Sequence, residues 1–166
     1  RNLALDATVT SSSSRNAPRA WTRLNLIDMT TPLGLPVAPQ SGGTLGFHSA
    51  VSDKADAEKT LTLTLPEAMP LDEIRLVPVR RKDVPLWFDY GFPLTYKVEA
   101  ATKEDFSDAV LLHEVTDRLA PTPGMNLVCI PARRIPAKHI RITTKQLWYR
   151  KSDHVFALAE FQALSA

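Results

Sequence analysis

The segment TLTLTL, residues 60–65, alternates threonine and leucine without interruption. Successive side chains of a β-strand point to opposite faces, so Leu61, Leu63 and Leu65 share one face and the threonines the other. This pattern predicts a half-buried antiparallel strand. Further strand-like segments follow at residues 73–80, 95–102, 110–115, 126–130, 139–145 and 155–164. The chain is therefore predicted to be largely β.

The thirteen prolines of this 166-residue chain support the same interpretation, because proline is costly inside a helix. Only short helical turns are expected, the first at residues 24–29. Residues 11–51 are rich in Ser, Thr, Pro and Gly and predict a loop-rich N-terminal third. The segments at 110–115, 126–130 and 155–164 are apolar on both faces over part of their length, as central strands are. One domain over residues 1–166 accounts for the length.

Charge and composition exclude several classes of function. The formal net charge is +2 with basic and acidic residues interspersed, so no nucleic-acid partner is expected. No apolar run approaches the roughly 20 residues of a membrane span. The single cysteine, Cys129, forms no internal disulfide and is predicted to be a small buried hydrophobe. No nucleophile elbow, phosphate loop or metal cluster appears, and the pairs Asp83 with Asp89 and Asp105 with Asp108 are ordinary for surface loops, so the domain is predicted not to be an enzyme.

The order of motifs along the chain resembles the discoidin, or coagulation-factor C-type, domain. The matching segments are NLALDATVTSSSS (2–14), LNLIDM (24–29), GFHS (46–49), the strands from 60 to 79, GFPLTYKVEAAT (91–102) and HIRITTKQLWYRKSDHVFALAEFQAL (139–164). The chain departs from that family at Met29, where the usual residue is glycine, and at Phe47, where it is commonly tryptophan. The resemblance implies an antiparallel jelly-roll β-sandwich of the galactose-binding type, with the two chain ends side by side.

The resemblance also implies a function. Many such domains are non-catalytic carbohydrate-binding modules of secreted, glycan-degrading enzymes such as bacterial glycoside hydrolases. A glycan partner, a covalently linked catalytic domain, and an extracellular or periplasmic location are therefore expected. The alternative is a structural or protein-interaction domain of the same fold that packs on a catalytic neighbour and has no affinity for sugar.

Two aromatic and polar loops are the predicted ligand site, because sugars stack on aromatic rings and hydrogen-bond to polar groups. The first loop, within RRKDVPLWFDYGFP (80–93), contributes Arg81, Trp87 and Tyr90, with Phe92 expected in the core. The alternatives are core positions for the rings and a solvated strand end for Arg81. The second loop, QLWYRKSDH (146–154), contributes Trp148 and Tyr149 beside Arg150 and His154; Trp148 could instead cover the core.

Two further features complete the expected site. His48 is placed at the binding face by the resemblance, although a histidine beside a phenylalanine is commonly a hydrogen-bonded structural residue. The resemblance also implies a structural Ca2+ held by Asp28, Thr31 and Glu160, since calcium prefers carboxylate and carbonyl oxygens. The competing interpretation of Glu160 is a salt bridge to an arginine such as Arg23.

Overall fold

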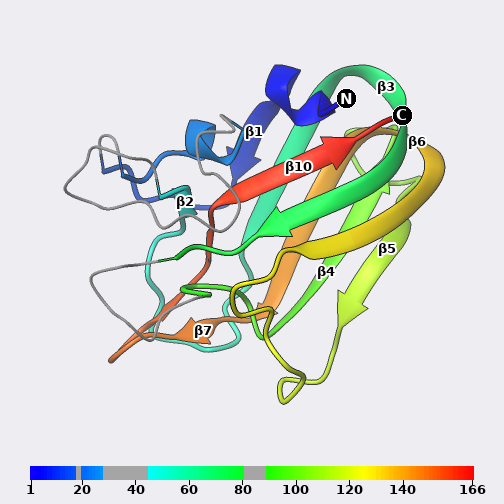
Figure 1. The fold of residues 1–166 in the computed structure, drawn as a ribbon. Coiled ribbons are helices and arrows are strands. Elements are labelled where there is room, and N and C mark those ends of the chain that lie inside the picture. The colour runs from blue at the N-terminus through cyan, green and yellow to red at the C-terminus, as the bar shows by residue number, and fades with distance from the viewer. Residues whose placement is uncertain (18–19, 28–44, 81–88) are drawn as a thin grey trace.

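The computed structural model describes residues 1–17, 20–27, 45–80 and 89–166, and it shows a β-sandwich (Figure 1). The longer strands are β1 (Thr8–Ser11), β3 (Thr60–Val77), β4 (Thr95–Ala101), β5 (Val110–Val115), β6 (Val128–Gln146) and β10 (Glu160–Leu164). The shorter ones are β2 (Phe47–His48), β7 (Trp148–Tyr149), β8 (His154–Val155) and β9 (Ala157–Leu158). The 3-10 helices are η1 (Leu3–Asp6) and η2 (Arg23–Leu26). The predicted fold class is therefore confirmed.

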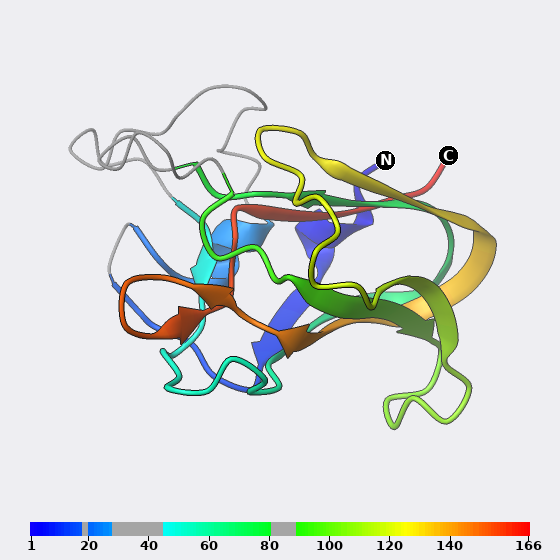
Figure 2. The ribbon, with the colours of Figure 1, turned by 90° about the horizontal axis from the view of Figure 1, so that it is seen from below.

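The strands β3 and β6 bend and contribute to both layers of the sandwich. Residues 61–64 of β3 pair with β1 on one side, and residues 60–64 pair with residues 139–143 of β6 on the other. Residues 73–77 pair with β10 on one side, and residues 73–76 pair with residues 128–131 of β6 on the other. Strands β4 and β5 extend the first layer in the order β1-β3-β6-β4-β5. Figure 2 shows the two layers from below.

The leucines of the opening pattern form the centre of the core. Leu61 and Leu63 have no exposed surface and Leu65 is 1% exposed, while the intervening threonines are half-buried, as alternation predicts. Tyr96 and Ile142 also point inward, from neighbouring strands. At a typical value of about 25 cal/mol for each Å2 of apolar surface removed from water, such burial is the main stabilising contribution to the fold.

The two ends of the described chain lie side by side (Figure 1). Asn2 pairs with Leu164 as an isolated bridge, and the amino group of Arg1 donates to the carbonyl of Ser165 at 2.7 Å. The side-chain oxygen of Asn2 accepts hydrogen bonds from Ala4 N and Ala163 N, so a single amide caps η1 and holds β10. This arrangement matches the expectation drawn from the family resemblance.

Three expectations about local structure are wrong. The segment at 110–115 is not a central strand: it is the edge strand β5, with Leu111 53% exposed. Cys129 is exposed, because its side chain lies on the outer face of β6. The apolar run at 155–164 is divided among β8, β9 and β10, because its parts pair with three different strands, β7, β2 and β3.

A bulge lies where β6 passes from one layer to the other. Leu71 of β3 pairs with Ile135 and Glu73 pairs with Pro131, so three residues of β6 face one residue of β3. Within this bulge Arg133 and Arg134 have φ values of 53° and 61°. Left-handed backbone costs a non-glycine residue roughly 1–2 kcal/mol. The bend of the strand therefore contains two arginines in the left-handed conformation, rather than glycine or asparagine.

Candidate functional site

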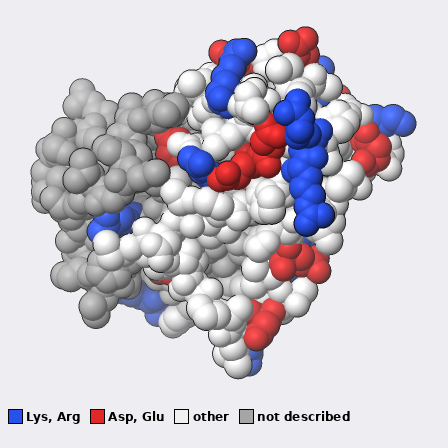
Figure 3. All heavy atoms as spheres, turned by 45° about the vertical axis from the view of Figure 1, so that its right-hand side comes forward, with Lys and Arg blue, Asp and Glu red and all other residues white. Residues whose placement is uncertain are grey.

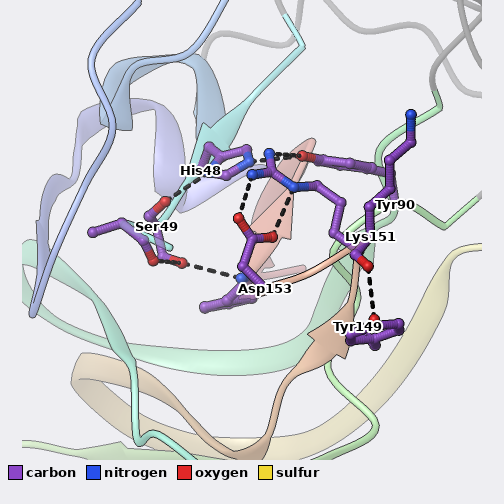
Figure 4. Close-up of polar contacts among 9 residues, drawn as sticks. His48, Ser49, Tyr90, Tyr149, Lys151 and Asp153 are labelled. Carbon is purple, nitrogen blue, oxygen red and sulfur yellow. Dashed lines mark hydrogen bonds and ion pairs between the residues drawn. The ribbon is translucent and has the colours of Figure 1, made fainter. Parts of the chain in front are cut away.

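A connected set of polar side chains lies at one end of the sandwich, where β2, the residues around Tyr90 and the β7–β8 hairpin meet. Nε2 of His48 lies 2.8 Å from the hydroxyl of Tyr90, which also accepts a hydrogen bond from Nη1 of Arg150 at 3.3 Å. Figure 4 shows the chain of contacts running from Ser49 through His48 to Tyr90. Residues far apart in sequence therefore form one network.

The hydrogen-bond partners decide which atoms donate. Nδ1 of His48 lies 2.6 Å from the carbonyl oxygen of Ser49, and a carbonyl only accepts, so Nδ1 carries the proton. In the neutral ring Nε2 is then an acceptor, and the Tyr90 hydroxyl donates to it. The hydroxyl oxygen is left to accept from Arg150. Both rings are fully buried, so these bonds form away from water.

Arg150 and Asp153 form a two-bonded ion pair across the turn of the hairpin. Nε and Nη2 of Arg150 donate to the two carboxylate oxygens of Asp153 at 2.9 and 2.6 Å. The backbone N–H of Arg150 also donates to the carbonyl of Asp153 at 2.8 Å, which closes the turn. The Asp153 hydrogen bonds, with that of Tyr90, raise the pKa of Arg150 above its ordinary value. The two side chains remain 24% and 22% exposed, so this pair reaches the surface.

Aromatic rings pack around the polar network. The ring of Trp21 lies 4.9 Å from that of His48 and 6.0 Å from that of Tyr90, measured between centroids. The ring of Trp148 lies 5.1 Å from Tyr90. Trp148 is half-buried and packs against the cluster that contains Trp21 and Val155. This packing agrees with the interpretation of Trp148 as a residue that covers the core.

Tyr149 points away from that network. Alternation along β7 places it on the opposite face of the hairpin from Trp148, and Figure 4 shows it apart from His48 and Tyr90. Its ring is 5.3 Å from that of His154, its hydroxyl donates to the carbonyl of Lys151 at 2.7 Å, and it is 58% exposed. It is thus an aromatic side chain open to a ligand.

The predicted ligand residues separate into three groups. Tyr90 is fully buried, so the expectation that its ring is exposed is wrong: the residue pairs with Val79 and packs in the cluster that contains Trp21 and Val155. His48 is equally buried and takes the structural, hydrogen-bonded role given above as its alternative. Tyr149 is exposed as a ligand contact must be. Trp87 and Arg81 lie outside the described residues.

Sequence reasoning missed two members of the site. Asp153 received no role, although an arginine followed three residues later by an aspartate within a hairpin turn is a signal for an ion pair across that turn. Trp21 was also missed, because it stands in a segment without strand periodicity. Only the fold brings it against His48.

The expected calcium site is described only at Glu160. That carboxylate is 1% exposed and lies in β10 opposite Val77. Asp28 and Thr31 fall outside the described residues. Within the described part of the chain, no group of three or more His, Cys, Asp or Glu side chains is arranged to hold a metal ion. Calcium binding stays a prediction.

In the same described ranges, no helix has the length and apolar character needed to cross a membrane.

Comparison with solved structures shows which fold the chain has. A chitosan-binding module derived from a chitosanase/glucanase of Paenibacillus sp. IK-5 matches with a TM-score of 0.66, 14% identity and coverage of 99% of both chains. The family 32 carbohydrate-binding module of Clostridium perfringens NanJ, solved with galactose, gives a TM-score of 0.65, 16% identity and coverage of 98% and 96%. The chain has the discoidin-type fold of these modules.

The lectin domain of lectinolysin, solved with Lewis B antigen, shares the discoidin-type fold with a TM-score of 0.64, 11% identity and coverage of 100% and 97%. No protein-family model and no curated protein matches the chain. The resemblance seen in the order of the sequence motifs is thus confirmed for the fold.

Proposed function

We propose that this chain is a non-catalytic carbohydrate-binding domain that takes a sugar at the β7–β8 end of the sandwich. The observation that carries the proposal is the Arg150–Asp153 pair, which reaches the surface and is fixed from beneath by Tyr90 and His48. The fold shared with modules solved with galactose and other glycans supports it. A rigid scaffold commonly places its ligand contacts on loops of this kind.

The pair has the hydrogen-bonding capacity that sugar hydroxyls need. A guanidinium has five N–H groups, and Arg150 directs three of them to Asp153 and Tyr90. Two donors remain, and the Asp153 carboxylate keeps lone pairs beyond those that accept from Arg150. Adjacent hydroxyls of a sugar both donate and accept. A donor and an acceptor held in one plane suit such a pair of hydroxyls.

Tyr149 offers the second kind of contact that a sugar uses. Its exposed ring can stack against the C–H face of a sugar residue. Because Tyr149 and Arg150 point to opposite faces of the hairpin, we assign them to different residues of one glycan that passes around its tip. Trp87 and Arg81 remain predicted contacts of the same end.

The parent protein is proposed to be a larger, secreted, glycan-degrading enzyme, with the domain outside the cytoplasm and linked to a catalytic domain. Two neighbours in fold support this: the Paenibacillus module comes from a chitosanase/glucanase, and another Clostridium perfringens module comes from a family 31 glycoside hydrolase.

A glycan array probed with the purified domain, followed by calorimetric titration of the best ligand, tests the proposal. Arg150→Ala should weaken binding by about 10- to 100-fold, the range expected for lost hydrogen bonds to a charged group. Tyr149→Ala should weaken the binding of longer glycans more than that of monosaccharides.

Arg75→Ala is the matched control. Arg75 also pairs with an acid, Glu73 at 2.7 Å, but does so within β3, and its loss should leave binding unchanged. The proposal fails if the parent domain binds no glycan, or if Arg150→Ala binds as tightly as the parent domain while circular dichroism shows both folded.

A further inference from the structure

The sandwich is open along one side. Strand β5 is the last strand of the first layer, and it pairs only with β4 in the described part of the chain. The first residues of β6 border the other layer, where they pair with β3. Hollows lie between β5 and residues 128–135 of β6, and we call the groove that they form the edge groove. It is separate from the β7–β8 hairpin.

Two hollows lie along the edge groove. The first has a volume of about 310 Å3 and lies between Val110, Leu112 and the β6 residues Pro131 and Arg133. The second, of about 220 Å3, lies between His113 and Val115 of β5 and the prolines Pro121 and Pro123. The two hollows follow one another along the same strand. An extended chain laid beside β5 could therefore place side chains in both.

The β5 edge itself can bind an extended chain. In the described residues no strand pairs with its outer side, so its free N–H and C=O groups face outward. Exposed aliphatic side chains lie on it, with Val110 46% and Leu111 53% exposed. A peptide that adds to such an edge gains main-chain hydrogen bonds, and pockets for alternate side chains give it specificity.

One arginine lines the groove, and a second arginine follows it in the chain. Arg133 lines the first hollow, and Arg134 follows it in the β6 bulge. Both are exposed, and within the described residues neither forms an ion pair. The bulge would be less strained with glycine or asparagine, so its geometry does not explain why both residues are arginine. On the side of the molecule seen in Figure 3, a strip of basic side chains lies next to acidic side chains and borders a broad uncharged area.

We propose that the edge groove binds an extended peptide segment of another polypeptide, as an additional strand on β5. Apolar side chains of the peptide enter the two hollows, and its acidic side chains meet Arg133 and Arg134. Because the two arginines are positively charged, the bound peptide is negatively charged. The aliphatic and proline lining suits peptide side chains better than sugar, which needs open aromatic faces: the lining rings Phe92 and Tyr96 are 2% and 3% exposed.

A phage-displayed library of random linear peptides, selected on the immobilised domain, tests this proposal. Enriched peptides should alternate apolar and acidic residues. Fluorescein-labelled copies should bind at least tenfold more weakly to a variant with Arg133→Asn and Arg134→Asn, since asparagine tolerates left-handed backbone and keeps the bulge. Hydrogen exchange should slow at the β5 amides when the peptide is bound.

Arg118→Asn is the matched control, because Arg118 is an exposed arginine between β5 and β6 outside the hollows. The proposal is overturned if no peptide is enriched, if the double variant binds as the parent does, or if exchange slows elsewhere. It is also overturned if heparin binding depends on the two arginines, which would indicate an acidic polysaccharide. Self-association that Val110→Asp abolishes in sedimentation would indicate a second copy of the chain. Glycan binding at the β7–β8 hairpin is measured in its own titration, so the two proposals can fail independently.

Discussion

The hydroxyl of Tyr90 lies 2.8 Å from Nε2 of His48, and neither side chain has any exposed surface. This contact joins β2 to a residue 42 positions later in the chain. The Tyr90 hydroxyl then accepts from Arg150, which reaches the surface with Asp153. A buried bond thus sets the position of a surface group, and this relationship supports the first expectation.

Replacing Tyr90 with phenylalanine should destabilise the domain and loosen Arg150. The change removes the hydrogen bonds of the Tyr90 hydroxyl to His48 and Arg150; a hydrogen bond contributes about 0.5–1.5 kcal/mol, and one to a charged group about 1.5–3 kcal/mol. Urea unfolding should show that loss. Tyr149→Phe is the control, because the Tyr149 hydroxyl bonds at an exposed position and its removal should cost little. Equal stabilities for the two variants would contradict the assigned network.

Replacing Gly46 with alanine should prevent folding or lower the free energy of unfolding by more than about 3 kcal/mol. Gly46 has φ of +125°, and a Cβ placed there would lie 2.2 Å from the backbone oxygen of Leu158. The neighbouring backbone of β9 pairs with β2 and cannot withdraw without breaking that pairing. Thermal unfolding of the variant measures the effect.

Gly124 is the matched control for this experiment. It has φ of +61°, and a Cβ there would meet no atom within 4 Å. Gly124→Ala therefore carries only the backbone penalty of roughly 1–2 kcal/mol. If the two alanine variants unfold at the same temperature, the close approach of β9 to Gly46 is not what requires glycine.

Much of the fold could be predicted from periodicity, and its exceptions have physical causes. The Thr60–Leu65 pattern correctly places its leucines inside, because an alternating strand with one apolar face has one stable orientation. Periodicity did not show that β3 runs on to Val77, because the polar and proline-containing bend at residues 66–72 resembles a loop. It also misplaced β5, since apolar residues on both faces do not distinguish a central strand from an exposed edge.

The site was harder to predict than the fold. The QLWYRKSDH loop was correctly identified as a polar and aromatic end of the sandwich, but composition does not show which side of a hairpin each side chain takes. Tyr90 was misassigned for another reason: its hydroxyl bonds to the buried His48 and to the partly exposed Arg150, which only the tertiary structure brings near.

The hydroxyl of Tyr96 should ionise only at a pH above the ordinary range for a tyrosine. Burial raises its pKa to about 12, because the charged phenolate is poorly solvated in the core. An acid with a raised folded pKa stabilises the folded state below its unfolded value, and this contribution is lost as pH rises from about 10 through about 12. The difference corresponds to about 3 kcal/mol. Ultraviolet titration should show a phenol that ionises above the ordinary pH range and that is absent in Tyr96→Phe. A titration in which the wild-type domain and Tyr96→Phe differ by a phenol that ionises near pH 10 would contradict this.

Calcium should raise the melting temperature if the metal site implied by the family resemblance exists. Glu160 is a carboxylate buried beneath the sandwich surface, and burial of such a charge requires a compensating group, for which a divalent cation is well suited. A ligand at 100 times its dissociation constant stabilises the folded state by about 2.7 kcal/mol. Thermal unfolding with calcium, with magnesium and with chelator should therefore show an increase specific to calcium.

Glu160→Gln separates calcium binding from an ion pair with an arginine. Glutamine retains the size of glutamate and loses its charge, so the calcium-dependent increase should disappear while the unfolding temperature in chelator stays measurable. Glu58→Gln is the control, since Glu58 pairs with Lys145 at an exposed position and its neutralisation should leave the calcium response intact. If the parent domain has the same melting temperature in calcium and in chelator, it binds no structural calcium. An arginine such as Arg23 is then the expected partner of Glu160.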